Sequence, residues 1–318
     1  MLQGKKIAVV VPAYNEELLI SIVIETMPNY VDRVYVVDDC SVDETVKRVQ
    51  EYLEAPAYAG RMQLIRNTYN KGVGAAIVMG YRKASMDGMD VVAVMAGDAQ
   101  MAPDDLEAIL LPVVQGEVEY TKGNRLFTGD AWNIIPRYRY LGNSLLSLLT
   151  KISSGYWHLA DSQTGYTAIS KNTIDELPLE KLYSRYGYPN HILAMLNIYN
   201  KRVRDVPVKP IYNIGEQSGI RLSKDIPRIS LLLLKNFCWR MWEKYIIRDF
   251  HPLVFFYTLA FLLLGASVPL FIRILWVWAD TRVIPSINTL MYMFTAITGL
   301  QSLFFAMWFD ADYNKNLR

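Results

Sequence analysis

Two long stretches near the C-terminal end of the sequence contain no charged residue, namely residues 253–272 and residues 286–309. A helix of about 20 apolar residues is long enough to span the hydrocarbon core of a bilayer. Uncharged runs of this length are rare in soluble domains, where the alternative is a pair of helices buried in a large core. Residues 273–285 form a short link that contains two tryptophans, a residue type enriched at membrane interfaces. The two runs therefore predict a helical hairpin that crosses a membrane.

Basic residues around the hairpin predict its orientation. They cluster just before the first run and after the second, whereas the link contains only Arg273 and Arg282. The flanking residues are Lys235, Arg240, Lys244, Arg248, Lys315 and Arg318. Because cytoplasmic loops carry the excess of Lys and Arg, both chain ends are expected on the cytoplasmic side. The first residues lack the apolar core of a signal peptide, so we expect a multi-pass protein of the cell membrane whose N-terminal domain lies in the cytoplasm.

The overall charge excludes one class of partner. Lys and Arg number 33 and Asp and Glu 31, whereas proteins that bind nucleic acids usually carry a strong basic excess.

Cys40 and Cys238 are the only cysteines, which argues against a disulfide framework or a structural zinc site. The 318 residues allow one domain of roughly 200 residues and an appendage.

The first part of the chain alternates between strand-like and helix-like segments. Continuous apolar runs, which suit parallel strands covered on both faces, lie at residues 7–11, 34–37, 62–65 and 91–95. A segment of helical character follows each of them, at residues 16–27, 42–53, 74–84 and 103–114. This order predicts a doubly wound α/β domain with a mostly parallel sheet, in which ligands bind at the carboxyl ends of the strands.

Beyond residue 125 the pattern is mixed until an amphipathic segment begins. Residues 226–249 repeat apolar side chains about every four positions, with Trp242 and a basic complement, which predicts a helix lying in a membrane interface. Packing against the N-terminal domain is the alternative, and both can hold. The predicted organisation is a domain of residues 1–225, an interfacial helix of residues 226–250, and two membrane helices with a short tail over residues 251–318.

Polar motifs stand where the predicted strands end. They are Pro12-Ala13-Tyr14-Asn15-Glu16-Glu17, Asp38-Asp39-Cys40-Ser41-Val42-Asp43-Glu44-Thr45, Asn70-Lys71-Gly72-Val73-Gly74 and Ala96-Gly97-Asp98-Ala99-Gln100. Each is weak alone, since Ser41 or Asp43 can cap a helix and Lys71 can be a surface charge. Together they match what a nucleotide-diphosphate sugar requires, which is a polar slot for the nucleoside and a carboxylate that holds a divalent cation on the diphosphate.

With these motifs the chain resembles the family 2 glycosyltransferases of the GT-A fold. Within that family it is similar to the polyisoprenyl-phosphate glycosyltransferases of the dolichyl-phosphate mannose synthase and glucose synthase types. The resemblance covers roughly residues 5–225 and is carried by VVVPAYNEE, VVDDCSVDET, NKGVGAAI, AGDAQMAPDDL, KGNR and DSQTGY. It implies an inverting hexosyltransferase that depends on Mg²⁺ or Mn²⁺ and moves a hexose from a UDP- or GDP-linked sugar to a dolichyl or undecaprenyl phosphate.

The resemblance also implies roles for individual residues. The nucleotide-sugar-binding residues would be Pro12, Tyr14, Glu16, Val37, Asp38, Asp39, Lys71 and Gly97. Asp98 and Gln100 would hold the metal ion. The catalytic residues would be Asp98, Arg125 and Asp161, with Arg125 near a phosphate and Asp161 and Thr164 near the sugar and the acceptor.

Two positions depart from the family pattern. The usual D-x-D reads Ala96-Gly97-Asp98 here, so the first carboxylate is missing and Asp98 is expected to be the firm metal ligand. Near Tyr188-Pro189-Asn190-His191, many relatives have an acidic residue or a lysine. His191 is either a polar contact in the site or a histidine that simply faces solvent or a neighbour.

The chemistry of the implied acceptor explains why no general base is expected. A phosphate monoester has a second pKa of about 6, so it is largely dianionic and already nucleophilic at neutral pH. The site then needs cations that position one anion against another. Besides Arg125, the candidates for the acceptor phosphate are Arg137, Arg139, Arg221 and Lys224, although Arg137 and Arg139 can equally be surface charges.

Two other interpretations are weighed against this one. A processive polysaccharide synthase carries a Q-x-x-R-W motif, which Cys238-Trp239-Arg240-Met241-Trp242 does not match. A non-catalytic membrane scaffold that kept the fold is favoured by the missing first Asp. The sequence does not determine the sugar, the nucleotide or the length of the lipid. It also does not determine whether the chain forms a homo-oligomer.

Overall fold

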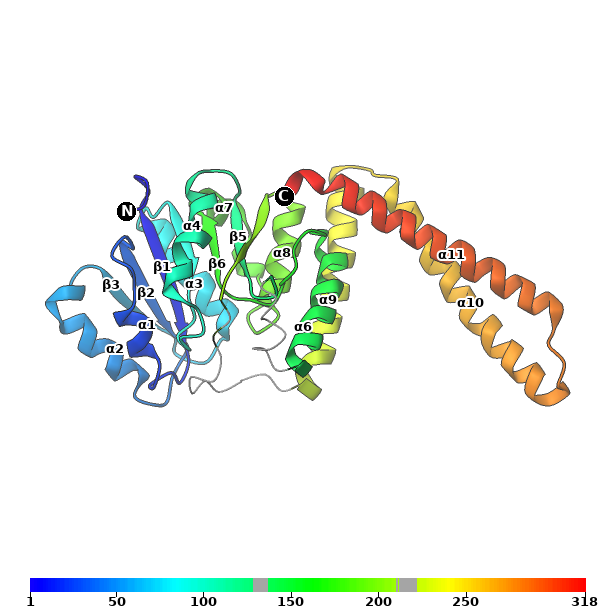
Figure 1. Cartoon of the computed structure of the whole chain (residues 1–318), viewed down its shortest axis with the longest axis horizontal. Coiled ribbons are helices and arrows are strands. Elements are labelled where there is room, and N and C mark those ends of the chain that lie inside the picture. The colour runs from blue at the N-terminus through cyan, green and yellow to red at the C-terminus, as the bar shows by residue number, and fades with distance from the viewer. Residues whose placement is uncertain (128–136, 210, 212–221) are drawn as a thin grey trace. The chain divides into compact units, whose positions relative to one another are not determined.

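The computed structural model describes residues 1–127, 137–209, 211 and 222–318, and the side chains of all these residues except 137–141, 143 and 222–226. The described chain forms two compact units. Unit 1 consists of Met1–Phe237 together with Leu317–Arg318, and unit 2 consists of Cys238–Asn316. Figure 1 labels the elements of both units.

Unit 1 is built on a seven-stranded sheet with the strand order β3-β2-β1-β4-β6-β5-β7. The strands are β1 (Ile7–Ala13), β2 (Arg33–Asp38), β3 (Met62–Arg66), β4 (Val91–Val94), β5 (Tyr120–Asn124), β6 (Thr167–Ser170) and β7 (Val203–Pro207). Only β6 runs antiparallel to its neighbours, which are β4 and β5. The mostly parallel α/β domain predicted from the sequence is therefore confirmed (Figure 1).

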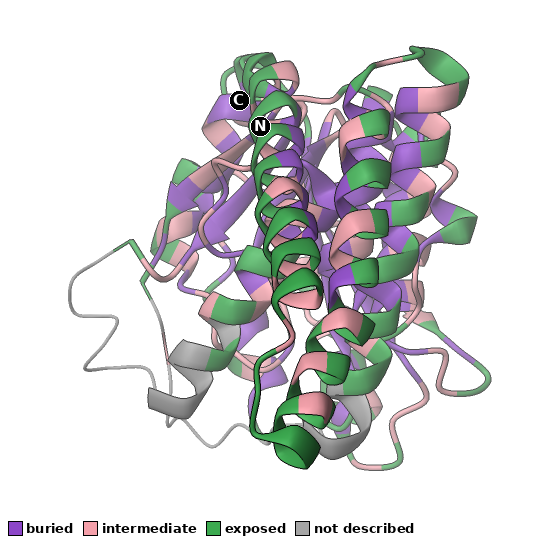
Figure 2. Ribbon diagram, turned by 90° about the vertical axis from the view of Figure 1, so that its right-hand side faces the viewer, coloured by how far each residue is buried: buried purple, intermediate pink, exposed green. Residues whose placement is uncertain are grey.

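Helices cover both faces of this sheet. The helices of this part of the chain are α1 (Ile20–Glu25), α2 (Thr45–Glu54), α3 (Val73–Met86), α4 (Leu106–Val114), α6 (Arg137–Ser154), α7 (Lys171–Glu176), α8 (Tyr188–Ile198) and α9 (Leu222–Trp242), with short 3₁₀ turns η1 (Pro56–Tyr58), η2 (Pro103–Asp105) and η3 (Leu179–Lys181). Figure 2 shows buried residues on the strands and exposed residues on the outer faces of the helices. The last residues of α9 belong to unit 2.

The apolar strands explain how the helices are fixed on the sheet. Every residue of β1 and β4 is buried, as expected for central strands covered on both faces. Gly80 lets α3 approach β1 closely, because a Cβ at this position would lie 2.3 Å from Val10 Cγ1. Full burial of a Val or Ile side chain contributes about 1.5–3 kcal/mol. This packing fixes α3 and the loop that precedes it.

Two elements differ from the predicted pattern. The apolar-run pattern does not predict β5, because Tyr120-Thr121-Lys122-Gly123-Asn124 is largely polar although all five residues are buried. α1 is shorter than the helix predicted over residues 16–27. It begins at Ile20 because the amides of residues 15–17 bond to side chains of residues 41–45.

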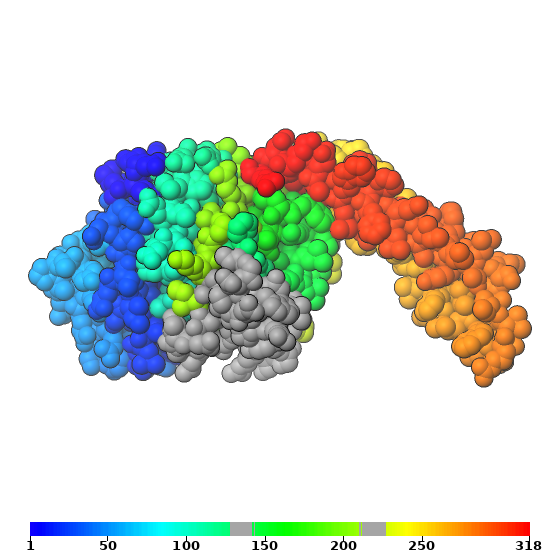
Figure 3. All heavy atoms as spheres, viewed as in Figure 1, coloured from blue at the N-terminus to red at the C-terminus, as the bar shows by residue number. Residues whose placement is uncertain are grey.

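Unit 2 contains two long apolar helices, α10 (Leu253–Thr281) and α11 (Ser286–Tyr313). Both are long and apolar enough to cross a membrane, with mean hydropathies of 2.1 and 1.5, and only 22% of each apolar window is buried. The two helices run side by side along their length (Figure 3). The predicted helical hairpin is therefore present, and its outer surface is apolar.

The link between the two helices is shorter than predicted. α10 continues through Arg273, Trp276 and Trp278, so only residues 282–285 connect it to α11. The expectation of a link over residues 273–285 is wrong, because Arg273 ends the uncharged run without ending the helix. A helix of 29 residues measures about 44 Å at about 1.5 Å per residue, which exceeds a hydrocarbon core of about 30 Å.

A buried polar cluster joins the start and the end of unit 2. Arg240 and Asp310 are both fully buried and form a two-pronged ion pair, with N–O distances of 2.6 and 2.9 Å. The Tyr245 hydroxyl, in the π-helix η4 (Glu243–Arg248), donates to Asp310 Oδ1 at 2.6 Å. Asn314 Nδ2 donates to the same Asp310 oxygen at 3.0 Å. Each charged group is thus satisfied inside the unit, as a buried ion pair requires.

Candidate active site

Three loops meet at the carboxyl edge of the sheet, where β1, β2 and β4 end. Ala13 pairs with Asp38 in the parallel register of β1 and β2, and the Asp39 amide donates to the Ala13 carbonyl at 2.9 Å. From β4, the Gly97 amide donates to the Pro12 carbonyl at 3.1 Å. The predicted motifs that follow these strands therefore converge on one place, as expected for parallel strands.

The loops after β1 and β2 hold each other through reciprocal hydrogen bonds. Asn15 and Glu17 each donate a backbone amide to a side chain of the second loop, Ser41 Oγ at 2.9 Å and Asp43 Oδ2 at 3.2 Å. In return, the side chains of Asn15 and Glu17 accept from the amides of Val42 and Glu44 at 2.9 and 3.0 Å. Ser41 and Asp43 thus serve the neighbouring loop, which keeps the edge of the site rigid.

Backbone strain is concentrated in the same loops. Asn15, Cys40 and Ala99 have positive φ angles of 57°, 67° and 55°, and each lies just beyond the end of β1, β2 or β4. A residue with a side chain pays about 1–2 kcal/mol for this left-handed conformation. Such strain persists where the surrounding structure imposes it, and it clusters at functional sites.

Carboxylates face one another at this edge. Burial, together with the negative charges of Asp98 and Asp43, raises the pKa of Glu16 to about 7. Glu16 also lies against the β4 loop, because a Cβ at Gly97 would be 3.4 Å from Glu16 Cγ. Asp98 Oδ1 accepts the backbone amide of Gln100 at 3.1 Å, which orients this carboxylate.

Asp39 anchors the loop that leads into α3. Its Oδ1 accepts from the Lys71 amide at 2.9 Å and from Asn67 Nδ2 at 2.8 Å, and its Oδ2 accepts from the Gly72 amide at 2.7 Å. The carboxylate is nearly inaccessible, with 3% of its residue surface exposed. Asp39 therefore positions the Asn70-Lys71-Gly72 segment, in addition to any contact with a nucleotide.

The glycines after Lys71 allow a second chain segment to approach. A Cβ at Gly72 would lie 2.4 Å from the Ser184 carbonyl oxygen, and a Cβ at Gly74 would lie 2.3 Å from that of Tyr183. The Gly74 amide donates to the Ser184 carbonyl at 2.8 Å, so residue 184 caps the first turn of α3. These glycines therefore serve close backbone packing.

His191 supports this approach from behind. Its Nδ1 accepts the Tyr183 amide at 2.9 Å, and burial lowers the pKa of the imidazole to about 4. The ring is therefore neutral at physiological pH and acts as a hydrogen-bond acceptor that holds residues 183–184 against α3. Of the two interpretations of His191, the structure thus supports the histidine that faces a neighbour, and this contact has a structural role.

Arg125 and Asp161, two of the predicted catalytic residues, form an ion pair in unit 1. Arg125 Nε lies 2.8 Å from Asp161 Oδ2, and its Nη2 lies 3.2 Å from Oδ1. The Gln163 amide donates to Asp161 Oδ1 at 3.0 Å. Asp161 is fully buried, and the positive charges of Arg125 and Lys122 outweigh burial and hold the pKa of its carboxyl below the usual value.

Tyr188 is a site residue that the sequence motifs do not reveal. It is buried at the start of α8, and its hydroxyl would lie 2.8 Å from a Cβ at Gly165 in the DSQTGY motif. Its Cβ lies 2.9 Å from the position of a Cβ at Gly74. Burial and the charges of Tyr81 and Asp98 raise the pKa of its phenol. Tyr188 thus packs against two of the motifs, and a lone tyrosine before a proline carries no sequence signal for this role.

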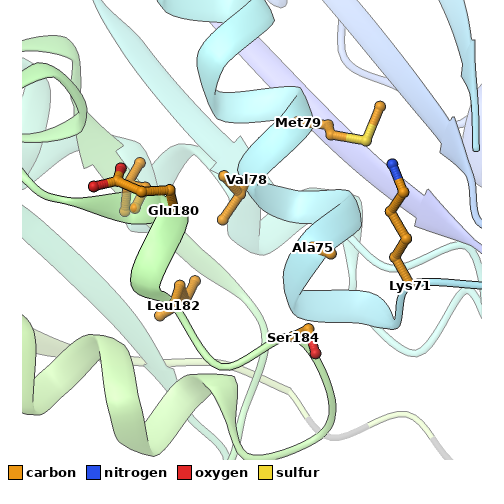
Figure 4. Close-up of a pocket in the computed structure, with 8 residues that line it drawn as sticks. Lys71, Ala75, Val78, Met79, Glu180, Leu182 and Ser184 are labelled. Atoms are coloured by element: carbon orange, nitrogen blue, oxygen red, sulfur yellow. The ribbon is translucent and has the colours of Figure 1, made fainter.

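A small pocket lies beside α3 and next to Lys71, which precedes this helix (Figure 4). Its volume is about 250 Å³, and its walls come from α3 and from the segment of residues 179–184. The lining side chains include Val78, Met79 and Leu182, with Lys71 and Glu180 as the charged groups. Ligand pockets usually measure about 300–1,000 Å³, so this pocket is too small for a complete nucleotide sugar.

The remaining predicted residues divide into those near the strand ends and those outside the described side chains. Pro12, Val37 and Asp38 are buried in the strand ends, and Tyr14 is exposed at 46% in the loop after β1. Lys71 Nζ lies 5.2 Å from the centre of the Tyr69 ring. The side chains of Arg137, Arg139 and Lys224, and the whole of Arg221, lie outside the described part of the structure.

The residues at the strand ends fit a divalent cation. Among the described residues no group of three or more His, Cys, Asp or Glu forms a protein cage for a metal ion. Mg²⁺ and related ions are nevertheless commonly held by one or two carboxylates together with substrate phosphates. Asp98 and Gln100 each carry a side-chain oxygen of the kind that ligates such an ion. The crowding of Glu16 and Asp98 is also what a cation would relieve.

Fold and site together define a class. A parallel α/β domain with carboxylates at the ends of β1, β2 and β4, and with the DSQTGY segment ion-paired to Arg125, is the arrangement of a GT-A glycosyltransferase. The chain matches glycosyl transferase family 2 over residues 8–178 and belongs to this family. The resemblance found in the sequence motifs is thereby confirmed.

Several curated relatives are polyprenyl-phosphate sugar transferases. The UDP-N-acetylglucosamine–dolichyl-phosphate N-acetylglucosaminyltransferase of Methanococcus voltae is 31% identical over 65% of this chain and 86% of its own length. The undecaprenyl-phosphate mannosyltransferase of Micrococcus luteus is 26% identical over 64% of this chain and 82% of its own length.

A solved structure with the same fold is glucosyl-3-phosphoglycerate synthase from Mycobacterium tuberculosis, in complex with Mn²⁺, uridine diphosphate and phosphoglyceric acid. Its TM-score is 0.54 at 18% identity, and the match covers 74% of this chain and 78% of that one. At this identity the similarity supports the fold of unit 1.

Proposed function

We propose that this chain transfers a hexose or N-acetylhexosamine from a nucleotide-diphosphate sugar to a polyisoprenyl phosphate, with inversion at the anomeric carbon. The observation that carries the proposal is the convergence of Glu16, Asp39 and Asp98 at one sheet edge of a family 2 chain that also has two apolar helices of 29 and 28 residues. A soluble acceptor would not require such a hairpin, whereas a lipid acceptor lies in the membrane that the hairpin enters.

In the proposed reaction an oxygen of the lipid phosphate attacks the anomeric carbon in line. The bond between that carbon and the nucleoside diphosphate breaks, and the electron pair leaves with the diphosphate. The acceptor phosphate is already ionised near neutral pH, so no residue has to remove a proton. This fits a site in which the described histidine near the motifs, His191, is neutral and engaged as an acceptor.

The residues of the chain bind and orient the reacting groups. Pro12, Tyr14 and Glu16 would border the nucleoside, and Asp39 fixes the Lys71 loop beside it. Asp98 and Gln100 would hold Mg²⁺ or Mn²⁺, which when bound stabilises the charge of the departing diphosphate. Arg125, aligned by Asp161, would face a phosphate, and the acceptor phosphate would meet cations such as Arg137, Arg139, Arg221 and Lys224.

The proposed location follows from the hairpin and from the flanking charges. The protein would be a membrane protein with two crossings, and unit 1 and both termini would lie on the cytoplasmic side. The relatives named for dolichyl and undecaprenyl phosphate support a lipid acceptor. Because the M. voltae relative is named for UDP-N-acetylglucosamine, this nucleotide sugar is the first donor to test.

The test is a donor and acceptor screen with the full-length protein in detergent or liposomes. UDP-N-acetylglucosamine, UDP-glucose and GDP-mannose are each incubated with a short polyprenyl phosphate and Mn²⁺, and lipid-linked sugar is identified by mass spectrometry. Unphosphorylated polyprenol serves as the matched control. The proposal expects product from at least one donor with the phosphate alone. Transfer to polyprenol at an equal rate, or no product from any donor, would contradict it.

A further inference from the structure

Two opposite charges, the buried Lys122 and the half-buried Asp205, lie on neighbouring strands of unit 1, away from the carboxylates at the ends of β1, β2 and β4. Lys122 in β5 and Asp205 in β7 are direct partners in the parallel register of these strands. Lys122 is fully buried, and Asp205 Oδ1 is buried without a hydrogen-bond partner among the described residues. Removing ionised groups from water is unfavourable unless they are paired, so their presence calls for a compensating role.

Both side chains hold the same chain segment. The Lys122 ammonium donates to the carbonyl oxygen of Thr164. Asp205 Oδ2 accepts the Ala160 amide at 2.6 Å and Asn124 Nδ2 at 3.1 Å. Asp205 therefore binds the first residue of the segment of residues 160–164, and Lys122 binds its last residue. This segment contains Asp161, the partner of Arg125.

The four charges of this region balance. Lys122 and Arg125 are the cations, and Asp161 and Asp205 are the anions. The attraction between Lys122 and the two carboxylates favours the charged forms of these groups, which burial disfavours. Burial lowers the pKa of Lys122 to about 8, while Asp161 and Asp205 act to raise it. Burial raises the pKa of Asp205 to about 6, and Lys122 acts to lower it. Loss of Lys122 would leave the buried Asp161 and the half-buried Asp205 with one cation.

We propose that Lys122 and Asp205 are positioning residues, which fix the segment of residues 160–164 and thereby hold the Asp161–Arg125 pair in the orientation that the transfer reaction uses. The inference rests on the proposed function for its catalytic part. The effect of the two residues passes through Thr164, Ala160 and the charge balance around Asp161.

The experiment compares Lys122→Met, Asp205→Asn and the double variant with the wild-type protein. Hydrogen–deuterium exchange of peptides that cover residues 160–166 reports on the segment directly and needs no turnover. Steady-state kinetics then give kcat and the KM for the nucleotide sugar. Thr121→Val is the matched control, because Thr121 is equally buried on the same strand but donates to the Ile109 carbonyl at 2.6 Å and not to this segment.

The proposal expects faster exchange of residues 160–166 in Lys122→Met and in Asp205→Asn, and no change in Thr121→Val. It expects kcat to fall by about 10- to 100-fold in Lys122→Met, since small displacements of reacting groups have effects of this size. The KM for the nucleotide sugar should change by less than about threefold, because the ends of β1, β2 and β4 are untouched. The double variant should recover part of the loss, since it leaves no unbalanced charge.

The outcomes separate this inference from the proposed function. Unchanged exchange in both single variants, or equal losses of kcat in Lys122→Met and Thr121→Val, would overturn the positioning role. A double variant whose loss equals the product of the two single losses would overturn the pairing. If wild-type protein transfers no sugar, the proposed function fails while the exchange measurement still decides the positioning role. If Lys122→Met does not fold, the nearly isosteric Asp205→Asn carries the same test at Ala160.

Discussion

Asp39 shows how one side chain can organise a substrate loop. Its two oxygens accept three hydrogen bonds, from Asn67 and from the amides of Lys71 and Gly72. In Asp39→Asn the new amide group would face at least one of these donors, which leaves a buried donor unpaired at a cost of about 1–3 kcal/mol. We expect weaker binding of the nucleotide sugar, measured by fluorescence titration, together with a lower unfolding midpoint. Unchanged affinity would show that the loop is held by other contacts.

His191 makes a prediction for pH. In the folded protein the pKa of this histidine is about 4, so the ring stays neutral until the pH falls near that value. In the unfolded chain it takes up a proton near the ordinary pKa of 6.5. The stabilising contribution is therefore complete above pH 6.5 and is lost as the pH falls toward 4. The unfolding free energy should decrease over this range by up to about 3 kcal/mol at about 1.4 kcal/mol per pKa unit.

The matched variant for this effect is His191→Gln, which retains an acceptor for the Tyr183 amide but does not titrate. The midpoint of thermal unfolding, followed in detergent between pH 4 and 7, should depend less on pH in the variant than in the wild-type protein. Identical pH profiles would assign the acid sensitivity to other groups.

At the scale of elements, the Arg240–Asp310 pair connects the end of α9 with the end of α11 inside unit 2. Asp310→Ala leaves a fully buried guanidinium without its carboxylate, for which the typical cost is about 3–5 kcal/mol. We expect a large fall in the unfolding midpoint of the full-length protein in detergent. The double variant Arg240→Met, Asp310→Leu should be destabilised far less, because the guanidinium and its carboxylate are removed together. Additive effects in this cycle would contradict the coupling.

The sequence predicts elements well where one physical pattern dominates. The apolar runs of β1, β2, β3 and β4 and of both hairpin helices are visible because burial on all sides, or contact with lipid, excludes charge. β5 escapes prediction because Lys122 and Asn124 are buried with partners from distant segments. The Arg240–Asp310 pair cannot be read from the sequence either, since it depends on a contact between residues separated by the whole hairpin.

The candidate site is predictable to a similar degree. The convergence of the strand-end motifs follows from parallel strand order, and the structure places the end of β4 beside the ends of β1 and β2. The contacts of Tyr188 with Gly165 and Gly74 do not follow, because they require the packing of α8 against two loops. For the same reason the structural role of His191 becomes clear only from its contact with the Tyr183 amide.

At the scale of the whole molecule, the orientation of the hairpin can be tested by labelling. In a variant without Cys40 and Cys238, a cysteine introduced at the exposed Ile284, in the link, should react with a membrane-impermeant maleimide added to intact cells. A cysteine at Lys315 should react only after the membrane is permeabilised. Labelling of residue 315 in intact cells would contradict the proposed cytoplasmic location of the ends.

The account as a whole depends on Asp98 and on a metal ion at the end of β4. The most direct measurement is the rate of sugar transfer to polyprenyl phosphate by the wild-type protein and by Asp98→Ala, each with Mn²⁺ and after chelation. We expect product from the wild-type protein with Mn²⁺, loss of product on chelation, and a rate lower by about 100-fold or more in Asp98→Ala. Transfer by Asp98→Ala at the wild-type rate, or undiminished transfer after chelation, would contradict the account.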